Sequence, residues 1–469
     1  MNILQRSKSL NKRQLLIVCE LVFFISISNT AFALPSFTRQ TGMACISCHT
    51  QAFGPNLTPL GRQFKLNAYS SGGGDSFLSR FGGTIQGSLT NTKRNDDKFI
   101  NPDNPNFDAN FKNRGYNSNN NLALDQASVF FGGKVLQQMG AFVQFSYDGI
   151  YNRLSLDNTD IRLSSESDVL DKNLIYGISF NNNPTVQDLW NTTPAWGFPY
   201  VGSSLANTPA VGPIIGALGQ QVGGATLYSM IDDLVFLEAG AYTSFAKYAQ
   251  KGLGEWDNGA VKIDGGAPYW RIALQKDWHG HYFSLGHFGF RANIQPNVNI
   301  AGTDRYTDLG MDFNYQYLAN PLHIYEVKAS YIREQQELLA TANQGGATHP
   351  QQQIGFLGLN GSYTYDQTYS FAAGFNHLSG STDTTLYASP TNKPNSEYFT
   401  FELDYVPFGK TASAGIESYL NIRFALQYVA YTRFNGSSKN YTNVQPGDTG
   451  MPRNASDNNT LYLNTWLIF

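Results

Sequence analysis

The chain has 469 residues, a formal net charge of −3 and a mean hydropathy of −0.31, with 14 % aromatic residues and 45 glycines. This length allows more than one domain, and the slightly acidic balance argues against nucleic acid as a partner. Composition alone fits both a soluble enzyme and a transmembrane barrel, because barrel strands alternate and never build a long apolar run.

The first 33 residues predict a cleaved secretory signal peptide. A basic start is followed by a mostly apolar run over 15–28 and by Ala-Phe-Ala over 31–33, the small-x-small pattern of a cleavage site before Leu34. The apolar run is short for a transmembrane anchor, which needs about 20 apolar residues. Removing the segment leaves 28 basic and 34 acidic residues, a net charge of −6. It also removes Cys19, so that only two cysteines remain.

Residues 34–75 contain the motif Cys45-Ile46-Ser47-Cys48-His49, which has the C-x-x-C-H pattern of c-type haem attachment. Each thiol would form a thioether with a haem vinyl group, and His49 would be the proximal ligand of the iron. A thiol–disulfide pair and a zinc half-site are the alternatives. The first needs a thioredoxin-like context, and the second needs further Cys or His nearby, whereas the next histidine is His279. We therefore predict one covalent haem c bound by Cys45, Cys48 and His49.

A helix is predicted directly after the motif, with Thr58 as N-cap and Pro59 at its first position. Arg62 or Lys65 could pair with a haem propionate, or both could belong to a solvated helix face. A unit of about 40 residues is too small for an independent core, so we expect it to sit in or against the periplasmic mouth of a barrel. The candidates for an apolar face over the porphyrin are Leu60, Phe64 and Tyr69.

A flexible linker is predicted at 70–74, and residues 76–469 then alternate with a period of two. In 309–317, 398–405 and 420–428, apolar residues occupy one face and polar residues the other. Short turns alternate with long polar loops, as in outer-membrane barrels. A soluble β-sandwich or propeller is the alternative, but most predicted strands are long enough to cross a membrane. The predicted strands start near residues 81, 122, 140, 157, 173, 221, 234, 269, 282, 307, 323, 351, 368, 396, 419 and 460.

The predicted fold is therefore mainly β: a transmembrane antiparallel β-barrel of about sixteen strands over 76–469, preceded by a small α-helical c-type cytochrome segment over 34–75. Its aromatic residues should point to lipid and its polar residues should line the lumen. The alternating last strand ends in Phe469 and resembles the C-terminal signature of bacterial outer-membrane proteins. These features predict a location in the bacterial cell outer membrane.

Three stretches together resemble the N-terminus of one family: LPSFTRQTG over 34–42, the haem motif, and LTPLGRQFKL over 57–66. The family is that of the outer-membrane monohaem c-type cytochrome–porin fusions of iron-oxidising bacteria. The likeness covers 34–69, with Thr38 where an alanine is expected, and beyond it only the architecture is shared. The resemblance implies haem attachment at Cys45 and Cys48 and iron ligation by His49. Members of this family pass electrons from extracellular Fe(II) toward the periplasm, so Fe(II) is a candidate donor and a soluble c-type cytochrome a candidate acceptor, although the motif does not by itself imply iron as substrate.

A distal iron ligand is not evident in the haem segment, because its one methionine, Met43, is too close to Cys45 to reach the opposite face of the ring. His287 shares its strand face with Arg291 and Asn293. We therefore predict that His287 faces the lumen, and it is the leading candidate for the distal ligand. The less favoured candidates, in predicted turns or on a lipid-facing run, are His279, His281, Met139 and Met311.

The sequence is compatible with three functions. The first is an electron conduit, which as an enzyme would be an Fe(II):cytochrome oxidoreductase. The second is a transport porin with a haem-bearing plug, and the third is a haem-based sensor with an open coordination site. Acidic lumen residues could attract Fe(II), but we favour ordinary lumen polarity balanced by Lys328 and Arg423. Those acidic residues are Asp312, Glu326, Glu402 and Asp404.

Overall fold

The computed structural model describes residues 36–72, 76–95, 115–254, 261–296, 302–410, 420–446, 448 and 450–469. The predicted signal peptide lies outside these described residues. Within them, no helix is both long and apolar enough to span a bilayer.

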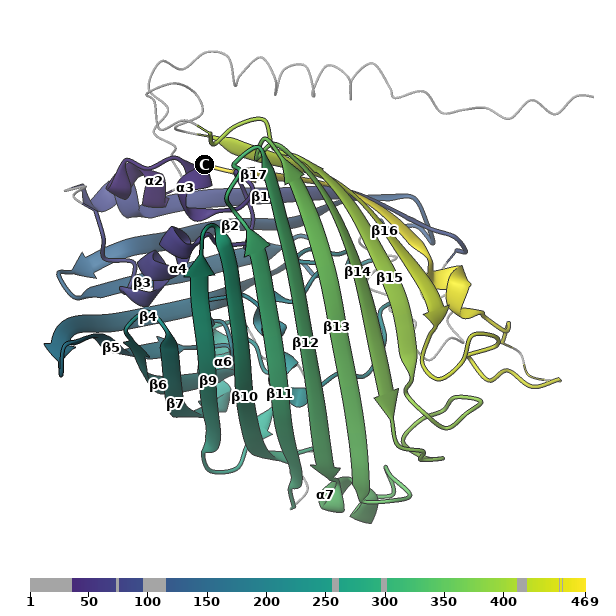
Figure 1. The fold of residues 1–469 in the computed structure, drawn as a ribbon. Helices are drawn as coiled ribbons and strands as arrows, with labels where there is room; N and C mark the ends of the chain where they lie inside the picture. Colours follow the sequence, from purple (N-terminus) through teal and green to yellow (C-terminus); the bar gives the residue numbers. More distant parts are fainter. Residues whose placement is uncertain are drawn as a thin grey trace, which may run out of the picture. The chain divides into compact units, whose positions relative to one another are not determined.

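Sixteen strands of the described residues close into an antiparallel β-barrel (Figure 1). The first and last strands, β1 and β17, pair over nine residues, so the ring has no free edge. Every predicted strand start lies within four residues of an observed one, which confirms the prediction of about sixteen strands. A seventeenth, two-residue strand, β8, pairs with the end of β10. The strands are β1 (Phe81–Thr92), β2 (Asn121–Leu136), β3 (Met139–Asp148), β4 (Arg153–Val169), β5 (Lys172–Asn181), β6 (Val222–Ile231), β7 (Val235–Ser244), β8 (Lys262–Ile263), β9 (Ala267–Trp278), β10 (His281–Gln295), β11 (Asp304–Tyr317), β12 (His323–Glu337), β13 (Gln351–Tyr365), β14 (Tyr369–Gly380), β15 (Ser396–Tyr405), β16 (Asn421–Arg433) and β17 (Thr460–Ile468).

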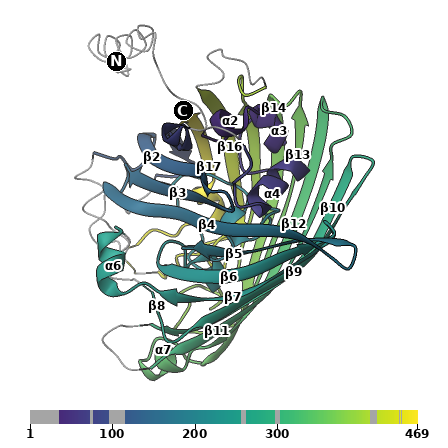
Figure 2. The same cartoon turned by 90° about the vertical axis from the view of Figure 1, so that its left-hand side faces the viewer.

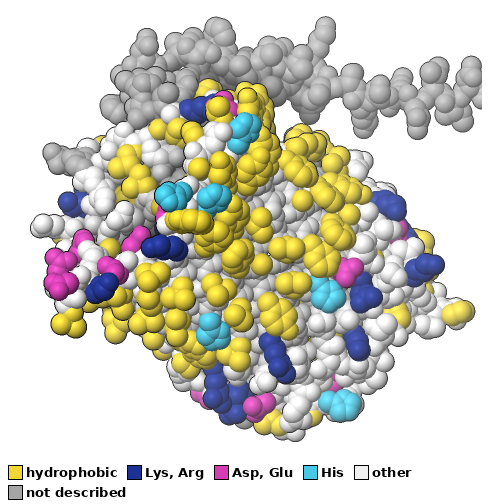
Figure 3. All heavy atoms as spheres, in the orientation of Figure 1, with side chains coloured by type: hydrophobic (Ala, Val, Ile, Leu, Met, Phe, Trp, Pro, Cys, Tyr) yellow, Lys and Arg dark blue, Asp and Glu magenta, His cyan; other side chains and the backbone are white. Residues whose placement is uncertain are grey.

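The alternation of the sequence decides which side chains face outward. In β15, Phe399 and Phe401 are exposed, whereas Thr400 and Glu402 are buried in the lumen. Hydrophobic side chains gather in this way over the outer face of the barrel (Figure 3). Exposing such a band to water would cost about 25 cal/mol for each Å² of apolar surface, so the outer face belongs in lipid.

Aromatic side chains form a belt on the outer face near the end with the short turns, which we call the turn end. His281 Nδ1 lies 2.9 Å from the Tyr315 hydroxyl oxygen, and His323 Nδ1 lies 2.8 Å from that of Tyr363. Aromatic girdles of this kind mark the membrane interfaces of outer-membrane barrels. The turn end therefore lies at one membrane surface.

The turns at this end are tight, and the connections at the opposite end, the loop end, are longer. Asp232 and Asp233 have φ angles of 56° and 51°, as type I′ hairpin turns require. Three helices lie at the turn end (Figure 2). They are α2 (Ser36–Thr41), α3 (Cys45–Cys48) and α4 (Pro59–Leu66); elsewhere the chain forms α6 (Lys247–Gly252), α7 (Leu339–Asn343) and the 3₁₀ turns η1 (Phe77–Arg80), η3 (Pro194–Trp196), η4 (Ile214–Gly216) and η6 (Ala455–Asn458).

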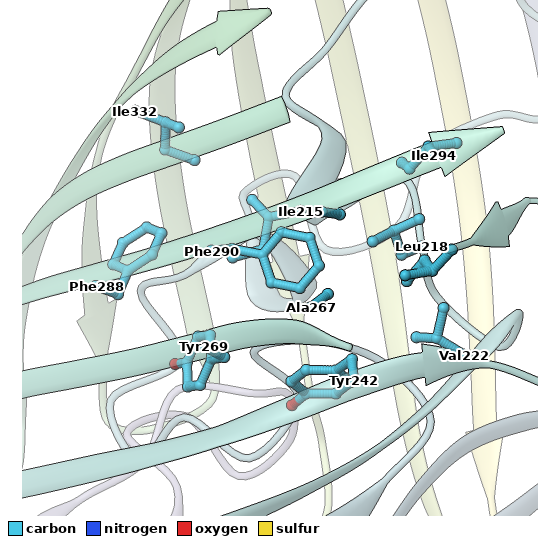
Figure 4. Packing of buried hydrophobic residues seen from close by; sticks show 12 residues of the cluster. Ile215, Leu218, Val222, Tyr242, Ala267, Tyr269, Phe288, Phe290, Ile294 and Ile332 are labelled. Atoms are coloured by element: carbon cyan, nitrogen blue, oxygen red, sulfur yellow. The ribbon is translucent and has the colours of Figure 1, made fainter. Parts of the chain in front are cut away.

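The connection between β5 and β6, residues 182–221, folds into the lumen, and we call it the inward loop. Its Ile215 and Leu218 are fully buried in a hydrophobic cluster with Phe288 and Phe290 of β10. Figure 4 shows Ile215 beside Phe290. The largest hydrophobic core of the described residues thus lies inside the barrel, between the inward loop and the strand wall.

Candidate haem-attachment site

The C-x-x-C-H motif forms a short helix and its cap. Helix α3 spans Cys45–Cys48, and the His49 amide donates to the Cys45 carbonyl oxygen at 3.0 Å, which makes His49 the C-cap. Residues three apart are neighbours on a helix surface, so both thiols lie on the same side. Both thiols are free in the described part of the chain. This local geometry suits two thioether bonds to one haem.

Helix α4 packs directly on the motif. Thr58 is its N-cap, as predicted, because Thr58 Oγ1 accepts from the Gly61 amide at 3.2 Å; it also donates to the Ser47 carbonyl oxygen at 2.7 Å. A Cβ atom at Gly61 would lie 2.3 Å from the Cys48 carbonyl oxygen. Only glycine allows the two helices to approach this closely.

The surroundings of the three motif side chains fit haem attachment better than redox chemistry of free thiols. Burial raises the pKa of Cys45, and burial together with the neighbouring Cys45 raises the pKa of Cys48 to about 11. A reactive redox thiol needs a lowered pKa instead.

The surroundings of His49 favour the neutral form of its imidazole. Burial lowers the pKa of His49 to about 4, although the nearby backbone carbonyl groups of Asn56 and Gly54 oppose this shift. The ring is therefore neutral at neutral pH, as ligation of a metal requires. Its Nδ1 atom is buried and has no hydrogen-bond partner among the described residues.

Two apolar side chains beside the motif are exposed on the surface of the structure. Leu60 of α4 is 41 % exposed, and Met43 is 36 % exposed. Tyr69, predicted to lie over the porphyrin, is instead buried, and its hydroxyl donates to Asp160 in β4 at 2.6 Å. An exposed apolar rim next to two thiols is a surface that a porphyrin could cover, so the residues present fit haem c.

The two basic residues of α4 are both buried, which excludes the alternative of a solvated helix face. Lys65 Nζ donates to the carbonyl oxygens of Val186 and Asp188 in the inward loop, at 2.8 and 2.6 Å. Arg62 Nη1 donates to Leu57 and Gln316, but Arg62 Nη2 is buried without a partner in the described part of the chain. Arg62 lies over the ring of Tyr282, 3.6 Å from its centroid, and keeps one buried nitrogen without a partner among the described residues, whereas Lys65 is bound by the inward loop.

The barrel holds the segment in its turn-end mouth, as expected from its small size. Asn421 of β16 donates to the Ala52 carbonyl oxygen at 2.6 Å, and the Ala52 amide donates to Gln367 in the turn between β13 and β14 at 3.1 Å. Phe53 packs edge-on against Trp466 of β17, with ring centroids 5.1 Å apart. Two strands and a turn thus supply part of the core that the segment lacks.

One arginine that we did not predict as a functional residue ties the inward loop to the wall. Arg271 of β9 has no exposed surface and makes a bidentate ion pair with Asp312 of β11, both distances being 2.8 Å. It also lies 3.2 Å from Asp188 of the inward loop and over the ring of Trp190, 5.1 Å from its centroid. The sequence offers no signal for this contact beyond a charged residue on the lumen face of a strand.

The acidic lumen residues named above are all paired with basic ones, which supports the interpretation as ordinary lumen polarity. Next to residues 50–56, the lumen retains a cavity of about 30 Å³ bordered by Gln51, Tyr200 and Arg423. That volume holds one or two water molecules. The ion pairs are Asp312 with Arg271, Glu326 with Lys328 at 3.5 Å, and both Glu402 and Asp404 with Arg423 at 2.6 and 2.8 Å.

The predicted distal ligand, His287, does not face the lumen, and that prediction is wrong. Its neighbour Phe288 is buried in the lumen core, and a Cβ on Gly286 would lie 2.5 Å from Asp312 Oδ2, so both neighbours of His287 point inward. His287 therefore points outward, where its Nε2 lies 3.3 Å from the indole nitrogen of Trp270. The other histidines outside the motif lie in turns or loops or on the outer face: His279, His281, His323, His349 and His377.

The fold and the site together define a class: an outer-membrane-type β-barrel of sixteen strands with a C-x-x-C-H segment in its turn-end mouth. No protein-family model matches the chain, and no curated protein matches it.

Solved structures with a similar course of the backbone include three outer-membrane proteins, each aligned with 83 % of this chain. They are a loop-deletion mutant of OmpT from Vibrio cholerae (10 % identity, 98 % of that chain, TM-score 0.41), an anion-selective porin from Comamonas acidovorans (9 %, 98 %, 0.43) and OprB from Pseudomonas putida (12 %, 94 %, 0.45). At such low identity these likenesses say nothing of haem or of transported solutes.

Proposed function

We propose that the chain is an electron-transfer protein of the bacterial outer membrane with one covalent haem c. Cys45 and Cys48 would hold the haem and His49 would ligate its iron, which supplies one-electron chemistry when bound. The apolar outer band suits outer-membrane lipid, and short turns face the periplasm in barrels of this type. The haem would then lie beside the periplasm, within reach of a soluble acceptor such as a c-type cytochrome.

The observation that supports this proposal most strongly is the position of the motif in the mouth of a packed lumen. The inward loop contacts both the barrel wall, through Arg271, and helix α4, through Lys65, and the cavity bordered by Gln51, Tyr200 and Arg423 is only about 30 Å³. A barrel filled in this way suits the passage of charge better than the passage of solutes. The resemblance over 34–69 supports extracellular Fe(II) as the electron donor.

A transport porin with a haem-bearing plug is the second candidate, and the closed sixteen-stranded barrel itself favours it. Porins of this size enclose an aqueous channel. In that case the inward loop and the cytochrome segment would have to leave a route for solutes, or move to open one.

Proteoliposomes separate the two functions. The full chain is inserted into vesicles that contain an oxidised soluble c-type cytochrome, and Fe(II) is added outside without oxygen. The proposal predicts reduction of the enclosed cytochrome by the native chain and none by the Cys45→Ser, Cys48→Ser double variant, while small sugars do not enter. Sugar entry with no cytochrome reduction would instead establish the porin.

A further inference from the structure

Two buried carboxylates in the half of the lumen nearer the loop end have no cationic partner among the described residues. Asp308 of β11 and Glu334 of β12 are directly paired across the two strands. Asp308 has no exposed surface and Glu334 is 1 % exposed. Like charges directly opposite each other in a sheet destabilise it, and burial makes an unpaired charge costlier still.

Their surroundings are apolar and contain the tip of the inward loop. Ile215 packs with Phe290 and Ile332 in the hydrophobic core (Figure 4). Among the described residues, no arginine, lysine or histidine lies within salt-bridge distance of either acid, in contrast to Glu326 beside Lys328 or Asp312 beside Arg271.

The inward loop contacts one oxygen of each acid. The Ile214 amide donates to Glu334 Oε2 at 2.5 Å, and the Ile215 amide donates to Asp308 Oδ2 at 2.9 Å. The two carboxylates therefore fasten the loop to the wall through these oxygens. The second oxygen of Asp308, Oδ1, is buried and accepts no hydrogen bond from an N–H donor of the described residues, and the Asp308 and Glu334 carboxyl groups lie within hydrogen-bonding distance of each other.

The side chain of Gln336, which contacts Glu334, carries an amide oxygen without a partner among the described residues. Gln336 is on the lumen face of β12, two residues from Glu334, and is 8 % exposed. Its Nε2 donates to Glu334 Oε1 at 2.5 Å, which fixes the carboxamide beside the acid pair, while its Oε1 is buried without a partner among the described residues. A proton shared by Asp308 and Glu334 would relieve their repulsion but would leave this oxygen unsatisfied.

We propose that Asp308, Glu334 and Gln336 form a binding site for one divalent cation that prefers oxygen ligands, such as Ca²⁺, Mg²⁺ or Mn²⁺. Carboxylate and carboxamide oxygens suit these ions, and a double positive charge neutralises both acids. The cation stabilises the attachment of residues 213–216 to the barrel wall. The site does not depend on haem.

The test measures Mn²⁺ binding to the full-length protein in detergent after treatment with a chelator. Free Mn²⁺ gives a sharp electron paramagnetic resonance signal that is lost on binding, so a titration counts the bound ions. The native chain should bind one Mn²⁺, and Ca²⁺ should compete for it and raise the melting temperature, because a ligand of the folded state stabilises that state. Asp308→Asn and Glu334→Gln should each abolish this binding.

Two further variants keep the test interpretable if the acid variants fail to fold. Gln336→Ala retains both carboxylates and should weaken Mn²⁺ binding roughly tenfold or more, the scale on which metal sites respond to loss of a supporting group. Glu326→Gln removes a buried acid that already contacts Lys328, and it should bind Mn²⁺ like the native chain.

Either of two results would overturn the proposal. One is the absence of stoichiometric Mn²⁺ and Ca²⁺ binding by the native chain, together with an infrared band of a protonated carboxyl group that Asp308→Asn removes; the pair would then share a proton. The other is binding that survives in folded Asp308→Asn and Glu334→Gln proteins, which would place the cation elsewhere.

Discussion

Replacing Arg271 by methionine should release the inward loop and open the lumen. The guanidinium has no exposed surface and contacts Asp312 at 2.8 Å and Asp188 at 3.2 Å. Arg271→Met retains most of the side-chain volume but leaves two buried carboxylates without their ion-pair partner. Breaking a buried ion pair by removing one partner costs about 3–5 kcal/mol.

The loop is the part that can respond, because Asp312 belongs to a strand and Asp188 to the inward loop. A cost of about 3–5 kcal/mol shifts the balance between attached and detached loop by roughly 100- to several-thousand-fold, since each 1.4 kcal/mol is about tenfold. Asp188 also accepts from the Thr192 amide at 2.9 Å, so a freed Asp188 would move together with that part of the loop.

Planar bilayer conductance and liposome swelling with small sugars measure the effect. Arg271→Met should admit sugars that the native chain excludes, while heat-modifiable electrophoretic mobility shows that the barrel remains folded. The triple variant Arg271→Met, Asp188→Asn, Asp312→Asn buries no charge at this place and should return close to native permeability, because neutral replacement of a buried ion pair is often tolerated. A permeability and melting temperature of Arg271→Met equal to those of the native chain would show that Arg271 does not hold the inward loop against the wall.

Three further predictions concern the cytochrome segment and the corrected histidine. Gly61→Ala places a Cβ 2.3 Å from the Cys48 carbonyl oxygen and should lower the yield of covalent haem, measured by haem staining of denaturing gels, at a cost of about 1–3 kcal/mol for overpacking; an unchanged yield would contradict the close packing. Burial lowers the pKa of Lys65 to about 7 from its usual 10.5, so the unfolded state binds more protons between these values and stability should rise with pH across pH 7 to 10.5. Lys65→Met should flatten that part of the pH profile of the melting temperature, and an identical slope in both proteins would count against it. His287→Ala should leave the haem absorption spectrum unchanged, because His287 faces outward. A change from a six-coordinate to a five-coordinate haem spectrum in this variant would instead indicate that His287 is the distal ligand.

The barrel could be predicted from sequence because alternation is a local property. In 398–405 and 420–428, apolar and polar residues alternate, and this alternation alone indicates which side chains face outward and which face the lumen. The strands β15 and β16 follow that pattern. The Thr58 cap and the C-x-x-C-H helix are equally local, since a cap, a proline and a fixed spacing act within a few residues.

The contents of the lumen could not be predicted in the same way. The local sequence of residues 182–221 does not predict the ion pair between Asp188 and Arg271. The two residues are more than 80 positions apart, and they come into contact only after the barrel closes. The burial of Lys65 has the same origin, since its partners are carbonyl oxygens of the inward loop.

The error at His287 follows from the inward loop as well. Polar residues line the lumen of a barrel when the lumen contains water, and Arg291 and Asn293 therefore suggested a lumen face. The inward loop makes this part of the lumen dry, so β10 turns Phe288 and Phe290 inward against Ile215. The usual rule is thereby inverted over residues 287–294 of this strand, whereas Phe283 and Leu285 face outward and Ser284 faces the lumen as the rule expects.

The most direct test of the proposed function is the absorption spectrum of the purified full-length protein in detergent, recorded without oxygen before and after addition of Fe(II). We expect the spectrum of a c-type haem that Fe(II) promptly reduces, and no haem in the Cys45→Ser, Cys48→Ser variant. A haem that dithionite reduces but Fe(II) leaves unchanged would contradict Fe(II) as the donor, and a native chain without covalent haem would contradict the proposed function as a whole.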